Sequence, residues 1–155
     1  MAEPNQPQGP FFGLERIYLK DVSYEAPGAP QIFLEQQAPE IGVQLGIEHR
    51  PLNAEQGLYD AVLTVTVSAK RGDKNVFLAE VQQAGVFRIK GVADEALQQA
   101  LEIACPHVLL PFAREAVNDL VCKGGFPQLL INPINFEALY AQKQAAIKQP
   151  VAGQA

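Results

Sequence analysis

Residues 58–70 read Leu58-Tyr-Asp-Ala-Val-Leu-Thr-Val-Thr-Val-Ser-Ala-Lys70, and this stretch decides the fold class. Its apolar positions alternate with mostly small or polar ones, which is the period of a β-strand with one buried face. The buried set is Tyr59, Ala61, Leu63, Val65, Val67 and Ala69. The segment Arg71-Gly-Asp-Lys74 supplies a turn, and residues 75–90 run back as a second strand. We therefore predict a β-hairpin in the middle of the chain.

Two further strands are predicted before this hairpin. Residues 14–25 are rich in β-branched and aromatic side chains and are followed by Pro27. Residues 41–47 alternate strictly, with Ile41, Val43, Leu45 and Ile47 on one face and Gly42, Gln44 and Gly46 on the other. Four consecutive antiparallel strands predict a meander that is covered on one face.

The second half of the chain changes to helical spacing. Residues 94–104 carry an apolar stripe, with Asp94 as the expected N-cap, and their polar side (Gln98, Gln99, Glu102) suits a hydrated contact between subunits. Pro106 is expected to interrupt this helix before a second one at about 107–123, which Pro111 should kink or delay. A last helix is expected after Asn135, a good N-cap. The predicted fold is α+β, a four-stranded antiparallel sheet with helices packed on one face.

The length of 155 residues suits a single domain, which we place at 11–148. The polar, proline-rich stretch 1–10 and the tail 149–155 are expected to be disordered. The N-terminus carries no basic segment followed by an apolar one, so we expect no signal peptide. No run approaches 18 apolar residues, so we expect no membrane span.

Several function classes have little support. The net charge is −5 and the 12 Lys and Arg residues form no basic cluster, which argues against nucleic-acid binding. His49, expected in a polar loop, and His107 lie far apart, and Cys105 is too close to His107 in sequence to suggest a catalytic pair. Cys105 and Cys122 have no metal-ligand spacing, and no glycine-rich phosphate loop is present. We expect no enzyme, no metal and no cofactor.

Residues 124–140 look like a connector but are unusually apolar. Gly124 and Gly125 suit the end of a helix, and Pro127 and Pro133 disfavour a new one. The apolar residues of this stretch and those of 41–47 allow two interpretations. The simpler is a plain core in which the last helix covers the sheet. The other is a groove that holds an extended, unfolded segment by burying apolar surface, at roughly 25 cal/mol per Å².

Three acidic residues form a second candidate feature. Asp21 and Glu25 are four positions apart on one predicted strand, so they face the same side. Glu80 lies in Leu78-Ala-Glu80 on the fourth predicted strand, and it shares a patch with them only if the first and fourth strands are neighbours. In an acidic protein, the default interpretation is a solvated sheet face.

Four motifs resemble the SecB family of bacterial protein-export chaperones, over roughly residues 11–142. They are Arg16-Ile-Tyr-Leu-Lys-Asp-Val-Ser-Tyr-Glu-Ala-Pro27, Phe77-Leu-Ala-Glu-Val-Gln-Gln-Ala-Gly-Val-Phe87, Cys105-Pro-His-Val-Leu-Leu-Pro-Phe-Ala-Arg-Glu115 and Gly125-Phe-Pro-Gln-Leu129. The resemblance implies a cytoplasmic, ATP-independent holdase for unfolded precursor proteins, assembled as a dimer of dimers. The chain departs from the family pattern in having no acidic residue after Glu137.

The resemblance also implies roles for named residues. A client groove would be lined by Ile41, Val43, Leu45, Phe126, Leu129, Leu130, Ile134, Phe136, Leu139 and Tyr140. The basic C-terminal segment of the translocase ATPase SecA would dock on Asp21, Glu25, Leu78 and Glu80. The alternatives are a domain with a closed cavity for a small apolar ligand, or an interaction subunit that never releases its partner. A client groove should be long and open, and a ligand cavity closed.

Overall fold

The computed structural model describes residues 9–148, so the disorder expected for 1–8 and 149–155 lies outside the described residues. In chain order the elements are β1 (Phe11–Glu25), the short 3₁₀ helix η1 (Gln31–Leu34), β2 (Glu40–Asn53), β3 (Leu58–Arg71), β4 (Lys74–Lys90), α1 (Asp94–Gln99), the π-helical turn η2 (Ala100–Ala104), α2 (Cys105–Lys123) and α3 (Phe136–Lys148). The α+β class predicted from the sequence is confirmed.

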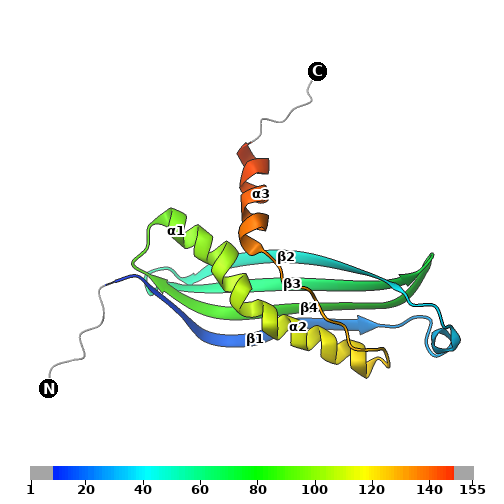
Figure 1. Cartoon of the computed structure of the whole chain (residues 1–155). Helices are drawn as coiled ribbons and strands as arrows, with labels where there is room; N and C mark the ends of the chain where they lie inside the picture. The colour runs from blue at the N-terminus through cyan, green and yellow to red at the C-terminus, as the bar shows by residue number, and fades with distance from the viewer. Residues whose placement is uncertain (1–8, 149–155) are drawn as a thin grey trace.

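The four strands form one antiparallel sheet in the order β1-β4-β3-β2. Strands β2, β3 and β4 follow one another as a meander. β1 does not join it beside β2, as a four-strand meander would require, but pairs with β4 on the other side (Figure 1). Residues 26–39, which include η1, connect β1 to the opposite edge of the sheet. β1 and β2 are therefore the two edge strands.

The alternation predicted for β3 separates the two faces of the sheet. Leu63, Val65 and Val67 are fully buried on the face that α2 covers. Thr64 and Thr66, with Ser68, point to the other face and stay partly exposed. This second face carries no helix in the part of the chain that the structure describes, and we call it the open face (Figure 1).

One long helical run, from Asp94 to Lys123, crosses the sheet (Figure 1). The predicted interruption at Pro106 is wrong, because the turn before it is π-helical and the Cys105 N–H donates to the Ala100 carbonyl. Pro106, which has no N–H, is thereby accommodated in the first turn of α2. The predicted N-cap is also wrong, since Ala93 occupies that position and makes no side-chain cap.

Helix α2 packs on the sheet through one stripe of side chains. Leu109, Ala113, Val117 and Val121 recur every four residues and are at most 1% exposed. Full burial of each larger apolar side chain contributes roughly 1.5–3 kcal/mol. Pro111 lies on the exposed side of the helix, where water can satisfy the carbonyl group that its missing N–H leaves free.

The connector between α2 and α3 has no regular secondary structure but is held in place. Gly125 has φ +87°, the left-handed conformation that glycine tolerates at a helix end. The Leu129 N–H donates to Oδ1 of Asn118 at 2.8 Å, and Nε of Arg114 donates to the Ile131 carbonyl at 3.0 Å. The connector therefore follows α2 back along the sheet.

Asn135 caps α3 as predicted, because the Ala138 N–H donates to its Oδ1 at 3.0 Å. Helix α3 rises away from the sheet instead of lying along it (Figure 1). Between residues 9 and 148, no helix is both long and apolar enough to cross a membrane.

Candidate functional site

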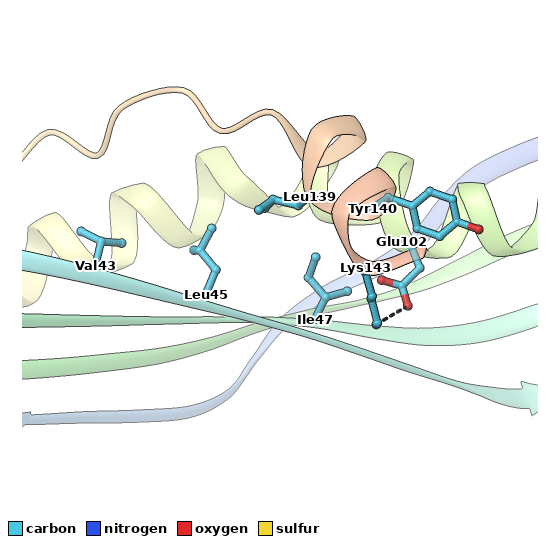
Figure 2. Close-up of a pocket in the computed structure, with 7 residues that line it drawn as sticks. All are labelled: Val43, Leu45, Ile47, Glu102, Leu139, Tyr140 and Lys143. Atoms are coloured by element: carbon cyan, nitrogen blue, oxygen red, sulfur yellow. Dashed lines mark hydrogen bonds and ion pairs between the residues drawn. The ribbon is translucent and has the colours of Figure 1, made fainter. Parts of the chain in front are cut away.

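The candidate site is a groove along β2, on the same face of the sheet as α2. We call it the β2 groove. Three adjoining hollows of about 400, 460 and 440 Å³ make it up. The first two share Ile41 and Leu129, and the last two share Val43 and Leu45, so the hollows follow one another along the strand. At the last hollow, Val43, Leu45 and Ile47 rise from β2 beneath Leu139 and Tyr140 of α3 (Figure 2).

The apolar side chains of the groove remain open to solvent. Ile41 and Val43 are 43% and 42% exposed, and Leu130 on the connector is 71% exposed. Leu63 and Val65, on the neighbouring strand, are completely buried under α2. The difference arises because α2 covers β3 and β4, so β2 is left beside the helix, with the connector and α3 above it and η2 contacting it at one end (Figure 1).

The structure brings together every residue predicted for the groove except Phe136. The hollows are lined by Ile41, Val43, Leu45, Phe126, Leu129, Leu130, Ile134, Leu139 and Tyr140. Phe136 is 2% exposed, belongs to the core and meets His107 edge-on at 6.5 Å between ring centroids. The plain-core interpretation therefore holds for Phe136, which anchors the start of α3.

Aromatic side chains that the sequence did not indicate build one end of the groove. Phe77 of β4 and Phe33 of η1 lie 5.0 and 5.3 Å from Phe126, measured between ring centroids. Arg71 holds the neighbouring loop, because its guanidinium donates to the Ile32 carbonyl at 3.1 Å and pairs with Glu35 at 3.3 Å. These contacts join residues that are far apart in the sequence, which explains why no local pattern predicts them.

A polar cluster at the other end of the groove was also missed. His49 lies in β2, not in a polar loop, and its Nε2 is 3.0 Å from Oε1 of Glu102. Nζ of Lys143 is 3.1 Å from the same oxygen (Figure 2). Glu102 was expected on the outer, polar side of its helix but is 8% exposed and faces inward. The π-helical turn changes which side chains face the sheet.

The acidic residues form a second feature, on the open face of the sheet. The prediction that the first and fourth strands are neighbours is confirmed by the β1–β4 pairing. Ser23 lies opposite Glu80, Asp21 opposite Gln82 and Glu25 opposite Leu78. Directly paired residues point to the same face, so the acidic side chains share the open face with Leu78, which is 38% exposed.

A buried carboxylate ties β1 to β3 on the same face. Oδ1 of Asp60, a residue 2% exposed, accepts the Tyr18 hydroxyl hydrogen at 2.5 Å. Nε of Arg50 is 3.7 Å from Oδ2 of Asp60. Burial, together with the hydrogen bond to Asp60, raises the pKa of Tyr18 to about 12. This bond crosses over β4 and holds the edge strand against the sheet.

The comparisons with known proteins agree with one another. Residues 5–147 match the family model described as SecB, preprotein translocase subunit SecB. The "Protein-export protein SecB" of Methylobacillus flagellatus is 48% identical over 90% of this chain and 87% of its own length. That of Chromobacterium violaceum is also 48% identical, over the whole of both chains.

A solved structure shares the fold. The SecB-like chaperone of Mycobacterium tuberculosis, in complex with a ChAD peptide from an antitoxin, matches with a TM-score of 0.67. The match covers 80% of this chain and 91% of the chaperone chain, at 16% sequence identity. At that identity the comparison supports the architecture, and the sequence relatives carry the family relationship.

Proposed function

This chain belongs to the SecB family, and we propose that it is a protein-export chaperone that captures unfolded precursor proteins in the β2 groove without using ATP. The observation that carries the proposal is the row of solvent-exposed apolar side chains along β2, faced by an equally apolar connector. Monomeric proteins rarely leave such contiguous surface uncovered unless it binds a partner.

The groove suits an extended chain of varied sequence. Its walls are mainly aliphatic and aromatic, so the main source of affinity is the burial of apolar surface, at roughly 25 cal/mol per Å². This term is non-directional and does not require a particular client sequence. Holding a client in this way requires no nucleotide and no catalytic group, so we propose that the chain is not an enzyme.

The second candidate function is the binding of a small apolar ligand in a closed cavity. The exposure of Ile41, Val43 and Leu130 disfavours it, because a ligand site buries most of its occupant. The three hollows follow one another along the strand, which suits a polypeptide better than a compact ligand.

We propose that the open face is the docking surface for SecA. Asp21, Glu25 and Glu80 would attract a basic segment and orient it, and exposed Leu78 would add an apolar contact. Delivery of a precursor to the translocase would require the protein on the side of the membrane from which precursors leave, so we propose a cytoplasmic location.

We also propose a homotetramer built as a dimer of dimers. The edge strand β1 exposes Leu14, Leu19 and Val22, which are 43%, 51% and 40% exposed. A long, apolar edge strand with free backbone groups favours pairing with another chain, and a second copy would cover it. Light scattering at micromolar concentration should give about four times the chain mass, and a monomer would contradict this assembly.

The decisive experiment is the suppression of aggregation. A chemically unfolded secretory precursor is diluted into buffer with and without the protein, in the absence of ATP. Equimolar tetramer should suppress light scattering by the precursor. Unchanged scattering would exclude the holdase function, and tight binding of a small apolar compound in the groove would favour the alternative.

A further inference from the structure

Glu102 joins three separate parts of the chain through one carboxylate. Its side chain is 10% exposed and lies in the π-helical turn η2. The same oxygen, Oε1, is 3.0 Å from Nε2 of His49 on β2 and 3.1 Å from Nζ of Lys143 on α3. The sheet edge, the crossing helix and the last helix therefore meet at a single buried atom.

This contact lies in the wall of the β2 groove. Glu102 and Lys143 line the same hollow as Leu45, Ile47 and Leu139 (Figure 2). The hollow is otherwise apolar, apart from the Tyr140 hydroxyl. The position of α3 decides how far this end of the groove is open, because α3 supplies the side chains that face β2.

Helix α3 has few other attachments. Among its residues, Phe136 is the one that is buried, and Leu139 and Ile147 are 38% and 69% exposed. Lys143 follows Phe136 by seven residues, or roughly 10 Å along the helix axis. The helix is thus held at its first residue by apolar packing and two turns later by an ion pair.

We propose that Glu102, through Lys143, is a positioning residue that holds α3 over β2 and so sets the closure of this end of the groove. The inference rests on the proposed client-binding function, because it assigns these residues a role in retaining a client. Loss of the ion pair would leave Phe136 as the one buried attachment of α3 within residues 136–148, and a bound client would escape faster past Leu139 and Tyr140.

The exposure of the Lys143 side chain suits an ion pair that breaks and re-forms as α3 moves. The Lys143 side chain is 54% exposed, so water can replace its carboxylate partner when the helix moves. Glu102 keeps His49 as a partner in that open state, and its buried charge is not left without a hydrogen bond. Half-exposed ion pairs are weak, so we expect several-fold effects and not complete loss.

The first test measures how strongly α3 is held in place when no client is bound. Amide hydrogen exchange of residues 137–148 is compared in the full-length protein and in the variants Lys143→Met and Glu102→Gln. Both should exchange several-fold faster in this segment, with little change in the buried strands β3 and β4. Lys148→Met is the matched control, because it makes the same change on the same helix at a lysine with no ion pair within residues 9–148.

The second test measures client release. Reduced, carboxymethylated α-lactalbumin carrying a fluorescent label serves as a permanently unfolded probe. Its dissociation rate should rise several-fold in Lys143→Met and Glu102→Gln, but not in Lys148→Met. The double variant should release it no faster than either single variant, because the two changes remove one shared interaction.

The outcomes separate this inference from the proposed function. Equal exchange and equal release in Lys143→Met and Lys148→Met would overturn the positioning role. Additive effects of Lys143→Met and Glu102→Gln would overturn it too. If the unaltered protein does not bind the probe, the proposed function fails, while hydrogen exchange still decides whether the ion pair holds α3.

Discussion

The Thr66 hydroxyl donates to a carboxylate oxygen of Glu80 on the neighbouring strand, at 2.9 Å. The two residues are direct partners in the β3–β4 register and lie on the open face. The bond restrains the Glu80 side chain within the acidic surface formed with Asp21 and Glu25. This preorganisation reduces the entropy that docking of a basic segment would cost.

Replacing Glu80 with Lys should weaken docking of the basic C-terminal segment of SecA by at least about tenfold, or roughly 1.4 kcal/mol. The change puts a positive charge where the partner is positive, so affinity should fall and its salt dependence should become smaller. Calorimetric titration at two ionic strengths measures both effects. Client binding should be unchanged, because Glu80 lies on the face opposite the groove.

The matched control for this prediction is Glu55→Lys, the same charge reversal in the exposed turn between β2 and β3. It should leave docking nearly unchanged. An equal loss in Glu55→Lys would mean that net charge, and not the acidic surface, governs docking. Loss of client binding together with docking would mean that Glu80 is structural.

Replacing Val43 and Leu45 together with Ser should weaken binding of an unfolded client by a few kcal/mol at most, since full burial of each side chain contributes roughly 1.5–3 kcal/mol. The sheet should remain folded, because Val43 is already 42% exposed. Binding is measured by fluorescence titration, and folding by circular dichroism. Leu34→Ser, at a residue 84% exposed outside the groove, should have little effect on binding. Unfolding of the double variant would support the plain-core interpretation.

Replacing Tyr18 with Phe should lower the free energy of unfolding by about 1–3 kcal/mol, because Asp60 loses its hydroxyl donor while remaining buried. Urea denaturation measures the change. Tyr59→Phe is the control, since no hydrogen bond from that hydroxyl occurs within the described part of the chain. If both variants lost the same free energy of unfolding, the hydrogen bond to Asp60 would make no specific contribution to stability.

The same tyrosine predicts how stability depends on pH. The pKa of Tyr18 is raised from 10.0 to about 12, so the folded protein holds the phenolic proton more tightly than the unfolded chain does. The stabilisation is fully present below pH 10 and is lost as the pH rises towards about 12. In Tyr18→Phe, the free energy of unfolding should not show this part of the decrease at alkaline pH. Urea denaturation at several pH values measures it.

The two cysteines should differ sharply in reactivity. Cys105 is completely buried, and burial raises the pKa of its thiol to about 12, whereas Cys122 is exposed. The thiolate is the reactive form, so iodoacetamide should modify the native chain once and the urea-unfolded chain twice. Mass spectrometry of tryptic peptides identifies the modified residue. Rapid native modification of Cys105 would contradict the packing of α2 on the sheet.

The sequence predicted the features that depend on local periodicity. The alternation in β3 gave the two faces of the sheet, and Asn135 gave the start of α3. The common face of Asp21 and Glu25 followed from their spacing, and the family resemblance brought Glu80 to the same patch. In each case the environment of a side chain is determined by its neighbours in the sequence or by the two-residue period of a strand.

The features that were missed depend on contacts between distant segments. His49 was expected in a polar loop beyond the strand predicted at 41–47, yet β2 continues through Pro51 to Asn53, because proline is tolerated on an edge strand. The inward turn of Glu102 results from a π-helical turn that the hydrophobic pattern does not reveal. Its partners, His49 and Lys143, lie 53 and 41 residues away, so only the folded chain brings them together.

The alternation of side chains along the strands has a consequence for the order of events in export. One sheet carries the groove on one face and the acidic surface on the other, so under the proposed function cargo and translocase would not compete for the same residues. On this proposal a loaded chain would bind SecA before it releases its precursor, and a ternary complex would be an intermediate of transfer. The two surfaces could then also evolve independently, because a substitution at Val43 that alters which precursors bind would leave the proposed docking surface at Glu80 unchanged.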